Sequence, residues 1–143
     1  MAKVTVDDKA LQKRLALISA RAKDSSGFTK PASIQMHRDV IDHFSREAAP
    51  SGKWKAWSTK YAEARAKGRG GSKILVDTGI LRGSIAFSNT SKTATVGTNT
   101  EYAATHNYGD SSRNIPKREF MWLSPKLITN LAEQFTKYVA GVI

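Results

Sequence analysis

Asp77 and His106 are the residue types in this sequence that most resemble a catalytic pair, because a carboxylate can orient a histidine that acts as a general base. They lie in the segment 74–109, ILVDTGILRGSIAFSNTSKTATVGTNTEYAATHNYG. A hydrolase would also need a nucleophile and an oxyanion hole, and the sequence has no GxSxG, HExxH or phosphate-binding glycine loop. Asp77-Thr78-Gly79 matches the aspartic protease tripeptide, but in those enzymes two such aspartates share a proton, and here a retroviral-type homodimer would be required to supply the second. We therefore expect no catalytic residue and no enzymatic activity, and we interpret the tripeptide as a capped turn.

Metal and thiol chemistry are also disfavoured. The chain has no cysteine, which excludes disulfides, thiol catalysis and cysteine zinc sites. Of the three histidines, His37 and His43 are six residues apart, so they do not share a helix face as metal ligands would. We expect no metal site, no cofactor-binding residue and no cofactor.

The chain of 143 residues is strongly basic. It has 23 lysines and arginines against 12 acidic residues, a formal net charge of +11 that suits a polyanionic partner. The excess is concentrated between residues 53 and 73, where Glu63 is the only acid. Trp54 and Trp57 lie among these cations, a composition that can bind nucleic acid by stacking and phosphate contacts. The interpretation we favour makes the tryptophans core anchors and residues 65–73 a mobile basic loop.

The length fits a single domain over residues 1–143. No apolar run approaches the roughly 20 residues that cross a bilayer, and the start MAKVTVDDKALQKR lacks the apolar core of a signal peptide. We therefore expect a protein that is made and used in a cytoplasm and has no membrane partner.

Apolar residues that recur every three or four positions predict long amphipathic helices. One covers residues 5–23, a second covers about 31–48, and a third begins at Pro125 after the N-cap Ser124. A short helix over 58–66 is expected to begin with a serine cap. The apolar stripe of the first helix is Leu11, Leu15, Ile18 and Ala22.

Alternating polar and apolar residues predict an antiparallel hairpin of residues 83–89 and 93–99. Residues 101–109 predict a short helix that ends at a glycine, and residues 119–123 predict a strand. The order of elements indicates an α+β fold, with a small antiparallel sheet packed by N-terminal and C-terminal amphipathic helices. We expect its core to contain Trp54, Trp57, Leu81, Ile85, Phe87, Val96, Tyr102, Phe120 and Leu123.

Four blocks occur in an order typical of one family: PSGKWKAWS, ILVDTGILRGSI, VGTNTEYAATHNYG and NIPKREFMWLS. Together they resemble the Mu-type phage virion morphogenesis, or tail completion, proteins over about residues 44–124. The family commonly has Gln-Phe-Gly at Asn107-Tyr108-Gly109 and Ala-Arg-Pro at Lys117-Arg118-Glu119, and both differences keep the aromatic residue and the arginine. The first 40 residues carry little family signal.

The resemblance implies a structural neck protein of the virion, assembled in the cytoplasm of a bacterial host as a homo-oligomeric, hexameric ring where the tail meets the head. Its partners would be a head-completion or adaptor protein and a tail terminator or tail tube protein, with phage DNA in the lumen. The alternative is a sequence-independent DNA-binding protein, whose affinity would fall steeply with salt. The cations expected in assembly are Arg65, Lys67, Arg69, Lys73, Arg113, Lys117 and Arg118. The residues expected to form the structural motif are Trp54, Trp57, Asp77, Thr78, Gly79, Leu81, Tyr102, His106, Gly109, Pro116 and Phe120.

Overall fold

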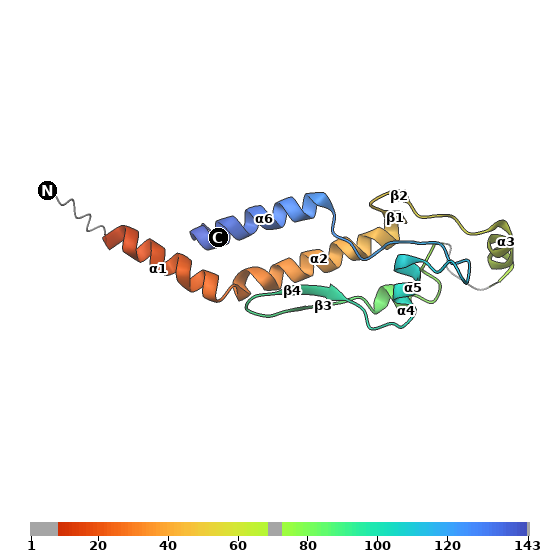
Figure 1. The fold of residues 1–143 in the computed structure, drawn as a ribbon, viewed down its shortest axis with the longest axis horizontal. Helices are drawn as coiled ribbons and strands as arrows, with labels where there is room; N and C mark the ends of the chain where they lie inside the picture. The colour runs from red at the N-terminus through yellow and green to blue at the C-terminus, as the bar shows by residue number, and fades with distance from the viewer. Residues whose placement is uncertain (1–8, 69–72, 143) are drawn as a thin grey trace.

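The structure is a computed structural model that describes residues 9–68 and 73–142 (Figure 1). The predicted α+β class is confirmed, since helices dominate and the strands pair as two separate antiparallel ribbons, β1–β2 and β3–β4. In chain order the elements are α1 (Lys9–Lys23), α2 (Ser26–Arg46), β1 (Ala48–Ala49), β2 (Gly52–Lys53), α3 (Thr59–Lys67), α4 (Ile80–Gly83), β3 (Ala86–Asn89), β4 (Ala94–Gly97), α5 (Ala103–Tyr108) and α6 (Pro125–Ala140).

Helix α2 is the central element of the fold. The β3–β4 hairpin packs along one side of it and α6 packs along another (Figure 1). The β3–β4 hairpin is therefore covered by α2, and the C-terminal helix α6 packs on another side of α2. The residues that α2 buries are Thr29, Ala32, Ser33, Val40, His43 and Phe44.

Helix α2 begins earlier than its sequence pattern predicts. We expected a break before Pro31, but the helix starts at Ser26 and contains that proline. The first turn of the helix is held by the turn of the β3–β4 hairpin. Thr29 Oγ1 donates to Thr90 O at 2.6 Å, and Ser25 N donates to Ser91 O at 2.8 Å. Tertiary contacts here outweigh the low helix propensity of glycine and proline.

The hydrophobic core lies between α2, the hairpin and the segment before α6. Phe44 is at its centre, with ring centroids 5.7 Å from Trp54 and 5.1 Å from Phe120. Buried aromatic pairs at such distances contribute beyond their area alone. The complete buried cluster is Val40, Phe44, Trp54, Leu81, Ile85, Ala103 and Phe120.

The predicted core is confirmed for Trp54, Leu81, Ile85 and Phe120, while Val96 and Leu123 pack against it half-buried. The prediction was wrong for Phe87 and Tyr102, which are 46% and 43% exposed, and Trp57 is half-buried outside the core.

The exposure of Phe87 follows from the small size of the sheet. The hairpin itself is confirmed, with Phe87 opposite Val96 in its register. A two-stranded ribbon is too small to bury a large side chain within its own surface, and the Phe87 ring packs beside His37, with centroids 5.3 Å apart.

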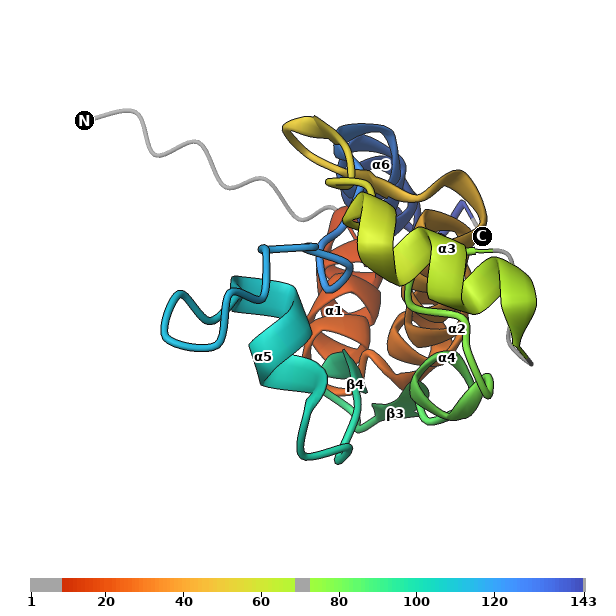
Figure 2. The same ribbon diagram turned by 90° about the vertical axis from the view of Figure 1, so that its right-hand side faces the viewer.

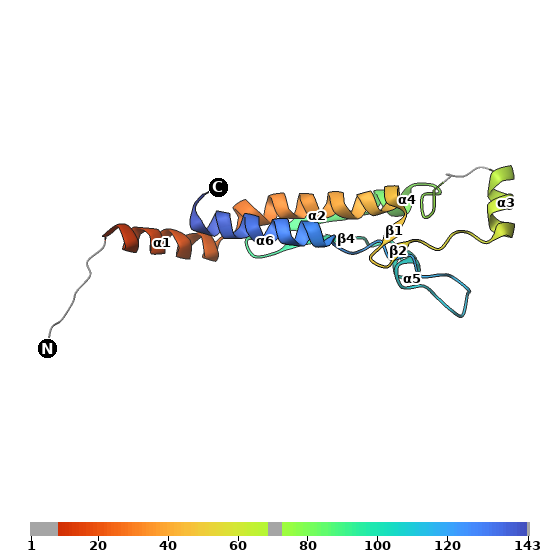
Figure 3. The ribbon, with the colours of Figure 1, turned by 90° about the horizontal axis from the view of Figure 1, so that it is seen from above.

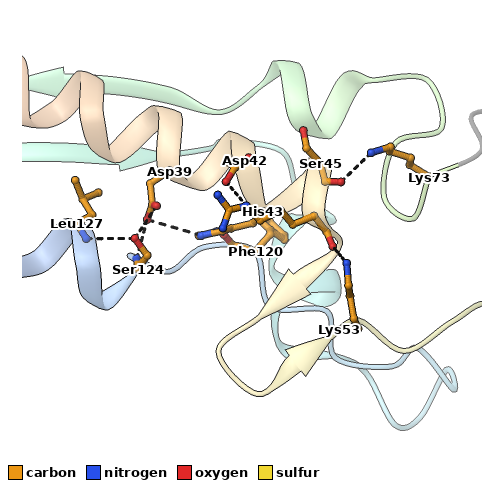
Figure 4. A network of polar contacts seen from close by, with 10 residues as sticks. Asp39, Asp42, His43, Ser45, Lys53, Lys73, Phe120, Ser124 and Leu127 are labelled. Atoms are coloured by element: carbon orange, nitrogen blue, oxygen red, sulfur yellow. Dashed lines mark hydrogen bonds and ion pairs between the residues drawn. The ribbon is translucent and has the colours of Figure 1, made fainter.

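Residues 119–123 do not form the predicted strand. Their backbone groups bond to side chains instead: Phe120 N and Met121 N both donate to Asn107 Oδ1, at 3.0 and 2.9 Å. On the other side, His43 Nδ1 lies 2.9 Å from Phe120 O (Figure 4). Because these groups are already satisfied, the segment does not need a neighbouring strand.

The start of α6 is built as predicted. Ser124 is the N-cap, and its Oγ accepts a hydrogen bond from Leu127 N at 3.3 Å. The same residue is fixed to α2, because its N and Oγ donate to the two oxygens of Asp39 at 2.7 and 2.8 Å (Figure 4). One carboxylate thus joins the central helix to the beginning of the last one.

The C-terminal end of α2 is bound by two lysines from other segments. Lys53 Nζ donates to Arg46 O, and Lys73 Nζ donates to Ser45 O at 2.8 Å (Figure 4). Both satisfy terminal helix carbonyls and complement the negative end of the helix dipole. These members of the basic segment therefore serve the fold.

Candidate binding cleft and assembly surface

A cleft of about 840 Å³ is lined by residues from the end of the molecule that carries α3, α4 and α5. Figure 2 shows the ribbon from that end. Side chains from before and within α3, from the turn before α4, and from around α5 form its walls. Many residues that the sequence assigned to separate roles meet here: Trp57, Arg65, Lys73, Asp77, Thr78, Gly79, Leu81, Tyr102, His106, Pro116 and Arg118.

One wall of the cleft is a stack of aromatic and basic side chains. Ser58 caps α3 as predicted, accepting from Tyr61 N. The helix then places Tyr61 and Arg65 one turn apart on one side, and Trp57, which precedes the cap, packs against Tyr61. The Arg65 guanidinium lies 5.2 Å from the Trp57 ring centroid and 5.8 Å from that of Tyr61. The sequence analysis did not identify Tyr61 as a site residue, although its position midway between Trp57 and Arg65, four residues from each, was a signal for it.

The Asp77-Thr78-Gly79 turn faces that wall. Asp77 Oδ1 lies 2.9 Å from Arg65 Nη1, an ion pair that joins the turn to α3. Gly79 has φ +79° and precedes α4, a backbone conformation that favours glycine. Thr78 Oγ1 accepts a long hydrogen bond from Ile80 N at 3.4 Å. The contacts of this tripeptide are those of a turn.

His106 and Asp77 line the same cleft but do not form a pair. No hydrogen bond or ion pair joins them in the described part of the chain. His106 Nδ1 is buried and has no hydrogen-bond partner there. Burial lowers the pKa of His106, and the charges of Arg118 and Arg113 lower it further. A histidine that is kept neutral and has no orienting carboxylate lacks the arrangement of a general base.

Arg118 was expected to be an assembly cation, and the structure buries it, with 8% of its surface exposed. Its Nε donates to Lys55 O at 3.0 Å, and its Nη2 makes a long contact to Ala56 O at 3.4 Å. Burial lowers the pKa of Arg118. The guanidinium thus connects the segment before α3 to the wall of the cleft.

Gly109 allows this wall to form. It ends α5 with φ +81°, and a Cβ at this position would lie 2.8 Å from Lys117 N and 3.1 Å from Ile115 O. Only glycine permits both the backbone conformation and the close approach. The returning chain then presents Pro116, half-buried, to the cleft.

Part of the segment predicted as a mobile basic loop, residues 65–73, lies outside the described residues. Arg65 and Lys67 belong to the last turn of α3, and Lys73 forms a β-bridge with a residue three positions later. Lys67 is exposed at the end of that helix. Arg69 lies outside the described residues.

The other expected assembly cations are held on the surface by nearby partners. Arg113 Nε lies 2.7 Å from Asp110 Oδ2, and its Nη2 donates to Thr105 Oγ1 at 3.1 Å. Lys117 Nζ lies 2.8 Å from Glu119 Oε2. Both cations are exposed.

Neither a metal centre nor a membrane span was found. Within residues 9–68 and 73–142, no group of three or more histidine, aspartate or glutamate side chains could hold a metal ion. In the same residues, no helix has the length and apolar character that crossing a membrane requires.

A second surface is formed by α1, which has no buried residue. The stripe predicted in the sequence is present, but Leu11 and Leu15 are 51% and 55% exposed. The helix extends beyond the rest of the molecule (Figures 1 and 3), and near its C-terminal end it contacts α6 and its Ala22 O accepts a hydrogen bond from Lys92 Nζ. There Arg21 Nη1 donates to Tyr138 O, and the guanidinium lies 5.3 Å from the Tyr138 ring centroid.

The exposed leucines of the amphipathic helix α1 form an apolar stripe of the kind that marks protein–protein contact surfaces. The model of the phage virion morphogenesis family matches residues 6–140, and the chain belongs to this family. The match includes the N-terminal helix, where the sequence blocks carried little signal. Comparisons with the curated proteins and with the solved structures gave no match.

Proposed function

We propose that this protein is a structural neck component that completes the tail, forms a homo-oligomeric ring at the head–tail junction and joins tail to head. Membership of the virion morphogenesis family supports an assembly role. The observation that carries the proposal is the exposed apolar face of α1. An isolated helix of this length is marginal in water and gains its stability when its apolar face packs. A neighbouring copy in a closed ring supplies that packing.

The partners above and below such a ring are a head-completion or adaptor protein and a tail terminator or tail tube protein. The net charge of +11 favours acidic surfaces on these neighbours. Ring assembly needs no catalytic residue, which agrees with the separation of His106 from an orienting carboxylate. The Mu-type likeness and the hexameric stoichiometry are parts of the same proposal.

Engagement of the basic side chains favours this role over sequence-independent DNA binding. Lys53 and Lys73 donate to the end of α2, and Arg65 pairs with Asp77. These cations are therefore not arranged as a row of exposed phosphate contacts.

The proposal is tested in infected cells with a phage that lacks this gene and is complemented from a plasmid. Replacing Leu11 and Leu15 together by serine should leave full heads and tails unattached, as counted by electron microscopy. The matched control, Lys13→Ser with Ala20→Ser, places two serines on the opposite face of the same helix and should give joined particles. Normal yields of joined particles from the leucine variant would refute the proposal.

A further inference from the structure

The cleft contains a buried positive charge that the described chain does not neutralise. Arg118 is 8% exposed, and its guanidinium contacts backbone carbonyls of Lys55 and Ala56. None of the ion pairs within the described residues includes it. A buried guanidinium is normally paired with a carboxylate or a phosphate, because desolvating an unpaired charge costs free energy. The described residues therefore supply no counter-charge for Arg118, and a bound anion would provide one.

A second unsatisfied polar group lies in a residue that lines the same cleft. His106 lines the cleft beside Arg118, whose backbone N donates to His106 O at 2.8 Å. Its Nδ1 is buried without a hydrogen-bond partner among the described residues. The wall of the cleft at Arg118 therefore also contains a buried polar group that the described chain leaves unsatisfied.

The other residues that line the cleft indicate the charge and the apolar character of a ligand that would fit it. Asp77 is the only carboxylate among the described residues of the lining, and it is already paired with Arg65. Lys55 adds an exposed cation to the lining, and Trp57 and Tyr102 add aromatic surface. A basic cavity with aromatic walls fits an acidic side chain that is flanked by apolar groups.

Burial of Arg118 distinguishes a peptide from a nucleic acid. Duplex phosphates lie on the outside of a wide, stiff rod, which cannot enter a cleft to reach Arg118, a residue that is 8% exposed. An extended peptide can insert a single glutamate or aspartate side chain into a cleft of about 840 Å³.

We propose that this cleft binds an extended, glutamate- or aspartate-containing segment of another virion protein, with Arg118 as the anion-binding residue. The identity of the partner as a virion protein rests on the proposed function. The chemistry of the site rests on Arg118, His106 and the lining of the cleft.

The experiment measures fluorescence anisotropy of a fluorescein-labelled hexaglutamate peptide with the full-length protein, and hexaglutamine is the uncharged probe. Hexaglutamate should bind and hexaglutamine should not. Arg118→Gln should weaken binding at least about tenfold, as expected for loss of a charge-assisted hydrogen bond. Lys60→Gln removes a charge from an exposed position of α3 outside the cleft lining and should change affinity less than about twofold.

Three results would overturn the inference: equal affinity of folded Arg118→Gln and the native protein, equal binding of hexaglutamine, or Arg118-dependent binding of a short DNA duplex that displaces the peptide. If Arg118→Gln does not fold, as judged by circular dichroism, the decision passes to Lys55→Gln. That exposed cleft residue should weaken binding more than Lys60→Gln does, and equal effects would again overturn the inference.

The two proposals fail separately. If hexaglutamate does not bind while the α1 leucine variant leaves heads and tails unattached, the cleft inference is wrong and the proposed function stands. If the peptide binds as described while the leucine variant assembles normally, the proposed function is wrong and the cleft is still a site for acidic segments.

Discussion

Helices α1 and α2 both carry apolar residues at helical spacing, yet the fold buries one pattern and exposes the other. Helix α2 lies between the β3–β4 hairpin and α6 and has Val40 and Phe44 fully buried. Helix α1 has no buried residue and extends past the rest of the molecule (Figure 3). Since the two patterns look alike in the sequence, the difference comes from what each helix packs against. It indicates that α2 stabilises the subunit, and it supports the proposal that α1 makes contacts outside the subunit.

The largest loss of stability should come from the core around α2. Phe120 is 1% exposed and packs on Phe44, so Phe120→Ala should lower the free energy of unfolding by about 3 to 5 kcal/mol. Urea denaturation followed by circular dichroism measures this change. Phe135→Ala is the control, because Phe135 on α6 is 41% exposed and should cost much less. Equal losses for both variants would mean that the core is misplaced.

A smaller loss of stability should follow when the contact between the start of α6 and α2 is weakened. Ser124→Ala removes the N-cap of α6, because Ser124 Oγ donates to Asp39 and accepts from Leu127 N. The free energy of unfolding should fall by about 1 to 2 kcal/mol. The same denaturation experiment applies. Thr129→Ala, on the exposed side of α6, should change the free energy of unfolding by less than about 0.5 kcal/mol. If the two variants behave alike, the Asp39 contact does not stabilise the junction.

The cleft end should show a dependence on pH that α1 lacks. Burial holds the pKa of His106 below its ordinary value, so below about pH 6.5 the unfolded chain binds more protons than the folded one. The free energy of unfolding should therefore fall as pH falls through this range, and His106→Gln should reduce the slope. An unchanged slope in the variant would show that His106 is not buried in solution.

A further and weaker dependence should appear in acid at the turn after α5. Hydrogen bonds from Ser112 and Arg113 lower the pKa of Asp110 to about 2. This stabilisation is complete above the ordinary pKa of 3.8 and is lost as the pH falls toward about 2. Asp110→Asn should remove that part of the acid titration of stability. The prediction fails if native protein and variant lose stability in parallel between these values.

Local signals predicted the elements of this fold well where the chemistry is local. Ser58 and Ser124 cap the helices that follow them, and Gly109 ends α5, as their residue types indicated. Residues 119–123 were predicted as a strand because their bonds to Asn107 are tertiary and leave no trace in local pattern.

The site was predicted only in part for a similar reason. The sequence assigned Arg65 and Arg118 to assembly and Asp77 and His106 to the structural motif, and the fold brings all four to one cleft. Their separate environments depend on packing between distant segments. Arg118, for example, is buried because Gly109 lets the returning chain approach, which no spacing in the sequence reveals.

The smallest effect on the subunit, and the largest on assembly, should come from α1. Leu11→Ser with Leu15→Ser should change the free energy of unfolding of the subunit by about 0.5 kcal/mol or less, because both side chains are half exposed. Lys13→Ser with Ala20→Ser is again the matched control.

Sedimentation velocity of the purified native protein and these two variants, over a range of concentrations, tests the central claim most directly. The account predicts a closed oligomer for the native protein and the control, and a folded monomer for the leucine variant. A native protein that stays monomeric at all concentrations, or a leucine variant that forms the same oligomer, would contradict the assignment of α1 as the assembly element.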